Sequence, residues 1–166
     1  MSTTEVRAPT AQDALELLSD EQDQILELFD RYDALVAEAA EADERRELAQ
    51  QICSLLVVHV QAKREILYPA ARAALDDDTP VDDTLEAHEA VEQSIADVQD
   101  GDATEPRYDA GVRVLQEQFV DAMETERTAL FPVLRASGVD LEELGAELGA
   151  LEERLLDADD DAAGTT

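Results

Sequence analysis

Apolar residues recur along most of the chain at steps of three and four, the spacing that places them on one face of an α-helix. Such stripes run through residues 11–41, 43–75, 80–101 and 106–136, and a shorter one runs through residues 139–157. No stretch alternates apolar and polar residues as a β-strand would. Four long amphipathic helices with short links predict an all-α fold, an antiparallel up-down four-helix bundle with a short fifth C-terminal helix.

The chain has 166 residues, a length that suits one compact domain. The predicted bundle occupies residues 11–136, and the fifth helix, residues 139–157, is expected to pack on it. Residues 1–10 are expected to form an N-terminal arm, and residues 158–166 an acidic tail.

The second and fourth predicted helices end in similar sequences. REILYPAAR at 64–72 matches RTALFPVLR at 127–135, with an arginine, a leucine, an aromatic residue, a proline and a second arginine in register. A proline late in a helix removes a backbone hydrogen bond and usually ends or kinks the helix. Its occurrence in both helices indicates two helix pairs related by a pseudo-twofold axis. This symmetry pairs three sets of positions: Gln22 with His88, His59 with Ala122, and Lys63 with Glu126.

Several polar residues lie on the apolar stripes, where core residues are expected. Both histidines of the chain, His59 and His88, do so, and its only lysine, Lys63, follows His59 by one helical turn. Glu126 lies on the stripe of the fourth helix, and Glu92 follows His88 by one turn. Helical bundles build metal sites from such inward side chains. Each histidine could instead be a hydrogen-bonded core residue. Lys63 could extend its ammonium to solvent, and Glu126 could be a carboxylate at the rim.

The composition excludes several classes of protein. Asp and Glu number 42 against 12 Lys and Arg, a net charge of −30, which argues against nucleic-acid binding. Apolar residues make up 45%, too many for a disordered acidic chain. No run approaches the roughly 18 apolar residues of a membrane span, and MSTTEVRAPT is not expected to act as a secretory leader. The single cysteine, Cys53, excludes an internal disulfide. We expect a cytoplasmic protein. The acidic excess predicts a halophile with a cytosol at molar salt, and an ordinary acidic protein is the alternative.

Four segments of the chain resemble the hemerythrin-like HHE family. They are LLSDEQDQILELFDRYD at 17–33, ICSLLVVHVQAKREILYPAAR at 52–72, LEAHEAVEQSIADV at 85–98 and FVDAMETERTALFPVLR at 119–135. The resemblance implies a four-helix bundle that holds a non-haem di-iron centre, used for oxygen binding or for iron and redox sensing. Its ligands are a histidine on the first helix, His-x-x-x-Glu on the second, a histidine on the third and His-x-x-x-Glu on the fourth.

Most of these ligand positions are altered in this chain. The altered positions are Gln22, Lys63 and Ala122. The remnant metal-ligand set is His59, His88 and Glu126, with Glu92 one turn after His88. An ammonium at the bridging-carboxylate position would repel divalent metals, so the resemblance implies no di-iron centre of the usual form. We expect Lys63 to pair with Glu126 in a metal-free polar cluster, with hydrogen bonds to His59, His88 and Gln22.

The sequence therefore predicts a non-enzymatic hemerythrin-like domain without a cofactor, in a structural or regulatory role. One alternative binds a single iron ion through His59, His88 and Glu126. Another is an oxygen or peroxide enzyme that uses the same pocket. No nucleic acid or membrane is expected as a partner, whereas a protein partner or a homodimer stays open and unidentified.

Overall fold

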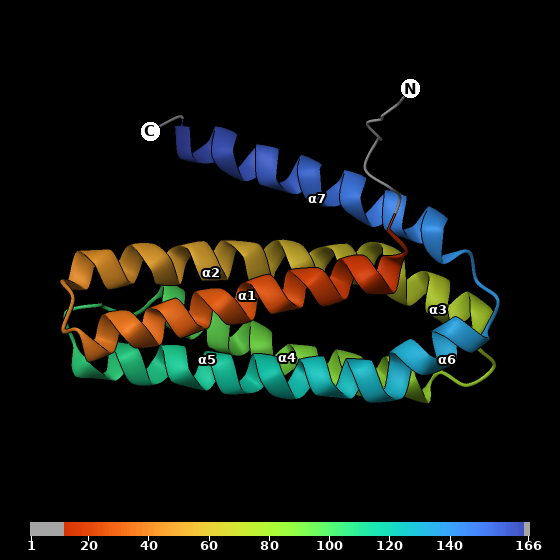
Figure 1. Cartoon of the computed structure of the whole chain (residues 1–166), viewed down its shortest axis with the longest axis horizontal. Coiled ribbons are helices and arrows are strands. Elements are labelled where there is room, and N and C mark those ends of the chain that lie inside the picture. Colours follow the sequence, from red (N-terminus) through yellow and green to blue (C-terminus); the bar gives the residue numbers. More distant parts are fainter. Residues whose placement is uncertain (1–11, 165–166) are drawn as a thin grey trace, which may run out of the picture.

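The computed structural model describes residues 12–164, and every regular element in that range is a helix (Figure 1). The elements are α1 (Ala14–Ala37), α2 (Ala42–Ala62), η1 (Lys63–Leu67), α3 (Tyr68–Ala74), α4 (Thr79–Gln99), α5 (Pro106–Thr125), η2 (Glu126–Leu130), α6 (Phe131–Ala136) and α7 (Leu141–Gly164). Side chains are described up to residue 158. The predicted N-terminal arm, residues 1–10, lies outside the described residues.

The first helix begins at a capping box. The Asp13 side chain accepts a hydrogen bond from the Glu16 backbone N–H at 2.8 Å, and the Glu16 side chain accepts one from the Asp13 N–H at 3.4 Å. After α1 the chain reverses through a tight turn in which Ala39 has a positive φ of 56°. This turn sends α2 back along α1, as the up-down prediction requires.

The four long helices close into the predicted bundle. Contacts join α1 to α2, α2 to α4, α4 to α5, and α5 back to α1. Two of the four long helices of the bundle are each built from three consecutive elements. One consists of α2, η1 and α3, and the other of α5, η2 and α6. The sequence prediction of four long helices is therefore confirmed, and each proline of the repeat lies inside one of these composite helices.

The two prolines are accommodated by wider turns and do not end their helices. Segments η1 and η2 are π-helical, and each lies directly before the aromatic residue and proline of the internal repeat. The Tyr68 N–H donates to the Lys63 carbonyl, and the Phe131 N–H donates to the Glu126 carbonyl, five residues back in both cases. A proline ring clashes with the carbonyl four residues earlier in an α-helix. A single π-helical turn within an α-helix is a known irregularity, and here it accommodates the proline.

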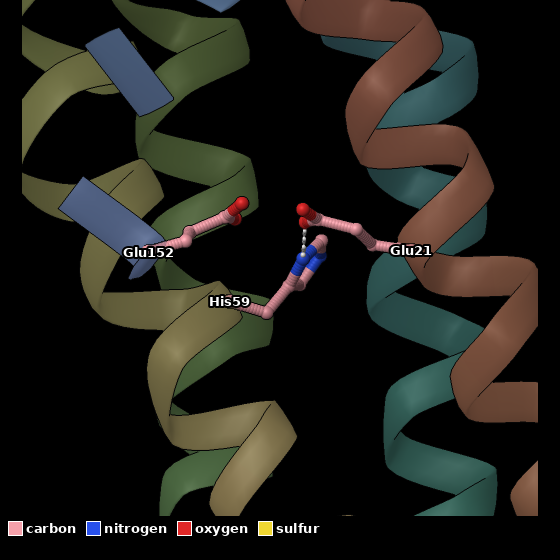
Figure 2. A group of neighbouring side chains, drawn as sticks. All are labelled: Glu21, His59 and Glu152. Carbon is pink, nitrogen blue, oxygen red and sulfur yellow. Dashed lines mark hydrogen bonds and ion pairs between the residues drawn. The ribbon is translucent and has the colours of Figure 1, made fainter. Parts of the chain in front are cut away.

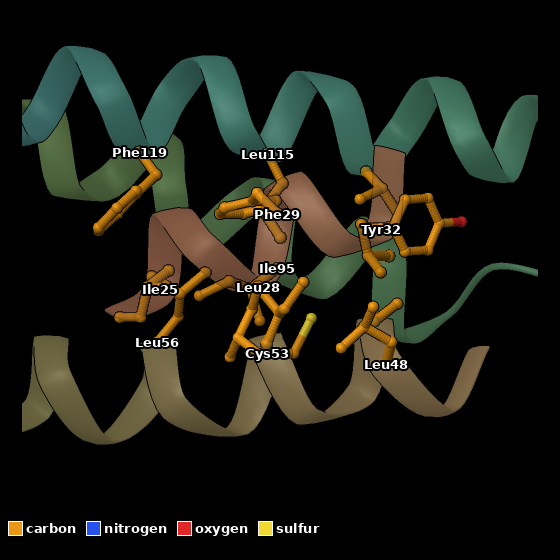
Figure 3. Packing of buried hydrophobic residues seen from close by; sticks show 14 of the residues in the cluster. Ile25, Leu28, Phe29, Tyr32, Leu48, Cys53, Leu56, Ile95, Leu115 and Phe119 are labelled. Atoms are coloured by element: carbon orange, nitrogen blue, oxygen red, sulfur yellow. The ribbon is translucent and has the colours of Figure 1, made fainter. Parts of the chain in front are cut away.

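Two hydrophobic clusters fill the bundle, one toward each end. The first includes Phe29, Leu56, Ile95 and Phe119 from the four long helices, and it buries Cys53 (Figure 3). The second includes Leu18, Leu67, Val81, Leu130 and Leu148. Aliphatic side chains predominate in both, which agrees with an aromatic content of 4%.

The fifth helix is long and lies across the face formed by α1 and α2 (Figure 1). It continues to Gly164, so the predicted end near residue 157 and the separate tail from residue 158 are both corrected. Leu144, Leu148 and Leu151 are its buried apolar residues. The backbone of α7 at Gly145 lies very close to the backbone just before α1. A Cβ on Gly145 would overlap the Gln12 carbonyl.

Candidate functional site

A layer of buried polar side chains separates the two hydrophobic clusters. Gln22 of α1, His59 of α2, Lys63 of η1, His88 of α4 and Glu126 of η2 are each at most 3% exposed. Each lies on its helix between residues of the first cluster and residues of the second. The stripe positions that the sequence singled out therefore face the interior of the bundle.

Lys63 and Glu126 form the centre of this layer. The Lys63 ammonium donates to Glu126 Oε1 at 3.1 Å, so the predicted contact across the pseudo-twofold axis is present. Gln22 donates to the same oxygen at 2.8 Å, and the Tyr68 hydroxyl donates to Oε2 at 2.7 Å. Both residues of the ion pair are the first residues of π-turns, so the paired irregularities place them at the same level of the bundle.

Burial and pairing have opposite effects on the charges of this pair. Burial alone would raise the pKa of Glu126, but the ammonium of Lys63 and the nearby hydrogen-bond donors hold that pKa below its usual value. Burial lowers the pKa of Lys63, while the carboxylates of Glu126, Glu21 and Glu152 oppose this shift. Glu126 is thus an ionised carboxylate whose counter-charge comes from the protein itself.

His88 lies beside the pair and is linked to it through Tyr68. Its Nδ1 lies 2.7 Å from the Thr84 carbonyl, and its ring meets the Tyr68 ring edge-on at a centroid distance of 5.7 Å. The Tyr68 hydroxyl, which donates to Glu126, lies 3.3 Å from the same nitrogen. Burial is the main cause that lowers the pKa of His88 to about 4, followed by the charge of Lys63. Because Tyr68 takes the aromatic position of the repeat, its role could have been inferred from its hydroxyl, which Phe131 lacks.

The second histidine turns away from the ion pair. His59 Nδ1 lies 2.9 Å from Glu21 Oε1, where a hydrogen bond to the Lys63–Glu126 pair was expected. Two acidic side chains lie on that side of His59: Glu21 comes from α1, and Glu152 comes from α7, which packs on α1 and α2. Burial, followed by the charge of Lys63, lowers the pKa of His59 well below its usual value.

Glu152 of α7 completes a three-residue group with His59 and Glu21. Figure 2 shows the two carboxylates pointing toward each other, with the imidazole beside them. Their potential ligand atoms all lie within 4.8 Å of one another, and this is the one such group among the described residues. Burial, followed by the facing carboxyl of Glu152, raises the pKa of Glu21 to about 10. The sequence analysis identified neither Glu21 nor Glu152. Glu152 does lie on the apolar stripe of Leu148 and Leu155, but among 42 acidic residues the sequence does not show which ones are buried.

The remaining candidates lie outside this layer or contribute no ligand atom to it. Glu92 does not join His88, because its carboxylate is held by two hydrogen bonds from Arg64, at 2.6 and 2.9 Å, on the surface. Ala122 packs in the first hydrophobic cluster. The structure therefore divides the remnant set: His88 and Glu126 meet through Tyr68, His59 meets Glu21, and Glu92 meets Arg64.

Comparisons with known proteins agree with the fold. A model of the Hemerythrin HHE cation binding domain family matches residues 13–134. The crystal structure of a hemerythrin HHE cation binding domain-containing protein from Mycobacterium kansasii is similar, with a TM-score of 0.77 and 19% identity over 93% of this chain and 94% of that chain. At this identity the likeness shows the fold alone. No curated protein matches the chain. Within residues 12–164, no helix has the length and apolar character needed to cross a membrane.

Proposed function

Since the chain belongs to the hemerythrin HHE cation binding domain family, we propose that its bundle core holds the Lys63–Glu126 ion pair in place of a di-iron centre. The domain is then a non-enzymatic structural or regulatory module. The observation that carries this proposal is the 3.1 Å contact between the Lys63 ammonium and Glu126 Oε1, with both side chains buried.

The side chains of the core do not fit a di-iron centre. Gln22, Lys63 and Ala122 stand at positions where the family pattern has ligands, and both oxygens of Glu126 already accept hydrogen bonds. Lys63 brings a positive charge to the position of a bridging carboxylate. A cation entering the core would meet this ammonium in a water-poor environment, where like charges repel strongly. The Lys63 ammonium supplies, next to Glu126, the positive charge that metal ions supply elsewhere in the family.

The two alternatives are less favoured by the same geometry. A single iron ion on His59, His88 and Glu126 would need His59 to leave Glu21 and Glu126 to give up the Lys63 ammonium. An oxygen or peroxide enzyme in this pocket would need a redox metal beside that ammonium. The Lys63–Glu126 ion pair therefore disfavours metal binding in the core under either alternative.

The test replaces the internal cation by a potential ligand. Lys63→Glu places a second carboxylate beside Glu126, and Lys63→Met is the matched control, which removes the charge without adding a ligand. Both variants and the parent carry Glu152→Gln, so that iron bound near Glu21 and His59 is not counted. Each protein is loaded with Fe(II) without oxygen, cleared of excess metal, and assayed for iron per chain and thermal midpoint.

We expect the Lys63 parent to retain almost no iron. Fe(II) should raise the thermal midpoint of Lys63→Glu, because the metal neutralises two buried carboxylates, and should leave Lys63→Met unchanged. Two irons per chain in the Lys63 parent, with an oxo-bridge absorption band in air, would overturn the proposal. So would a Lys63→Glu variant that has unaltered stability and binds no iron.

A further inference from the structure

We propose that Glu21, His59 and Glu152 bind one divalent transition-metal ion, of the class of zinc(II), which fastens α7 to the α1–α2 face. The site lies outside the Lys63–Glu126 ion pair, and Glu21 and Glu152 are not part of the family's ligand pattern. Each ligand comes from a different helix: Glu21 from α1, His59 from α2 and Glu152 from α7.

The three side chains already converge. Their ligand atoms lie within 4.8 Å of one another, and His59 Nδ1 is 2.9 Å from Glu21 Oε1. Zinc binds imidazole nitrogen and carboxylate oxygen at about 2.0–2.2 Å, so donors to one ion lie within about 4.4 Å of each other. Small side-chain rotations are enough to bring all three onto one ion.

Unpartnered polar atoms at the same place indicate a ligand. Glu152 is 7% exposed and His59 2% exposed, yet Glu152 Oε2 and His59 Nε2 are buried without a hydrogen-bond partner. The Glu152 carboxylate is aimed at the Glu21 carboxylate (Figure 2). Buried polar atoms are normally hydrogen-bonded, and each exception calls for an explanation. An ion between the two carboxyl groups would replace the Glu21 proton and give Glu152 Oε2 a partner.

The charges around the site permit a cation. Burial and the facing Glu152 raise the pKa of Glu21 to about 10, so the ion takes the place of the Glu21 proton. The two carboxylates and a neutral imidazole then have a summed charge that balances one divalent ion. Lys63 lies one turn after His59, but its ammonium is directed to Glu126, whose carboxylate offsets it. An imidazole with two carboxylates is a mixed nitrogen and oxygen donor set that suits zinc and neighbouring metals.

The site has space for a further ligand. A pocket of about 120 Å³ adjoins the three residues and is also lined by Leu55, Val58 and Leu156. Zinc sites with three protein ligands keep their fourth position for water or another small ligand. Because one of the protein ligands comes from α7, bound metal would stabilise the docked position of this helix by mass action.

The experiment measures zinc binding to the metal-depleted full chain by isothermal titration calorimetry. About 1 M KCl in the buffer screens diffuse attraction of cations to the acidic surface. The variants are Glu152→Gln, Glu21→Gln and the matched control Glu153→Gln, which removes an exposed charge from the adjacent position of α7. Hydrogen exchange of the α7 amides is measured with and without zinc.

We expect one zinc per chain in the wild type and in Glu153→Gln, and slower exchange of the α7 amides when zinc is bound. Loss of a ligand in Glu152→Gln or Glu21→Gln should weaken binding on the order of 100-fold, at least the effect of losing an outer-sphere partner, and abolish the zinc effect on exchange. Equal zinc affinity in the wild type and Glu152→Gln would overturn the site. Zinc binding without slower α7 exchange would overturn its role in fastening the helix.

Discussion

At the scale of single residues, Lys63 decides the chemistry of the bundle core. Its ammonium is fully buried, and one carboxylate compensates it at 3.1 Å. A buried ion pair adds little net stability over an apolar pair of the same shape, but removing one partner is costly. Each residue of the pair therefore depends on the other to compensate its buried charge.

This dependence can be measured with a double-mutant cycle on Lys63→Met and Glu126→Gln. Lys63→Met leaves the Glu126 charge buried and uncompensated, so it should lower the free energy of unfolding by about 3–5 kcal/mol. Adding Glu126→Gln should recover most of this loss, since the amide oxygen still accepts from Tyr68. Urea unfolding at a fixed KCl concentration gives the four values. Additive effects of the two substitutions would show that the residues are not coupled.

His88 makes the stability of the bundle depend on pH. Its pKa is about 4 in the folded chain, because burial and Lys63 disfavour the imidazolium, and about 6.5 when unfolded. The unfolded chain therefore binds more protons between these values, and stability falls as pH drops from about 6.5 to about 4. The full effect of this residue is about 3 kcal/mol.

The variant His88→Gln lacks the titrating group and should lose less stability over that range than the wild type. Urea unfolding at several pH values, at constant salt, compares the two proteins. His59 contributes with the same sign in both, because burial lowers its pKa also. Identical pH dependence of the two proteins would mean that His88 keeps an ordinary pKa in the fold.

At the scale of the elements, the contact between α7 and the start of α1 depends on a glycine. A Cβ on Gly145 would overlap the Gln12 carbonyl and approach the Ala14 nitrogen at 3.0 Å. These are backbone atoms of a capped helix start, which cannot move as a side chain can. The close approach therefore sets how near α7 lies to the bundle.

We expect Gly145→Ala to lower the free energy of unfolding by about 1–3 kcal/mol, the usual cost of overpacking. The matched control is Gly149→Ala, one turn later on α7, where nothing lies within 4 Å of an added Cβ. That substitution should raise stability by up to about 1 kcal/mol through helix propensity. Thermal and urea unfolding measure both variants. Equal effects at the two positions would contradict the close approach.

At the scale of the whole molecule, the net charge of −30 opposes compaction. Part of this repulsion is visible along α5, where Glu117, Asp121 and Glu124 are exposed on one face at helical spacing. Like charges at this spacing destabilise a helix. Salt is the natural remedy, since about 1 M salt shortens the Debye length to about 3 Å.

The free energy of unfolding should rise as KCl is increased from about 0.05 to 1 M, because screening weakens the repulsion. Urea is the suitable denaturant, since guanidinium chloride is itself a salt. The variant Glu117→Gln/Asp121→Asn/Glu124→Gln should be more stable than the wild type at low KCl and should respond less to added salt. A stability independent of KCl would refute the inference of adaptation to high salt.

The helical bundle could be predicted from the sequence, because hydrophobic periodicity and helix start and stop signals are local properties of the chain. The sequence also predicted the Lys63–Glu126 contact, since the internal repeat matches these two positions and the family resemblance places an ammonium there opposite a carboxylate. Other features depended on the tertiary structure. A sequence pattern does not give the direction of a buried side chain, so His59 was expected on the ion pair and lies on Glu21. Nor does it show which of many acidic residues a distant helix will cover. Only the docking of α7 decides that Glu152 faces Glu21, and so only the tertiary structure produces this group.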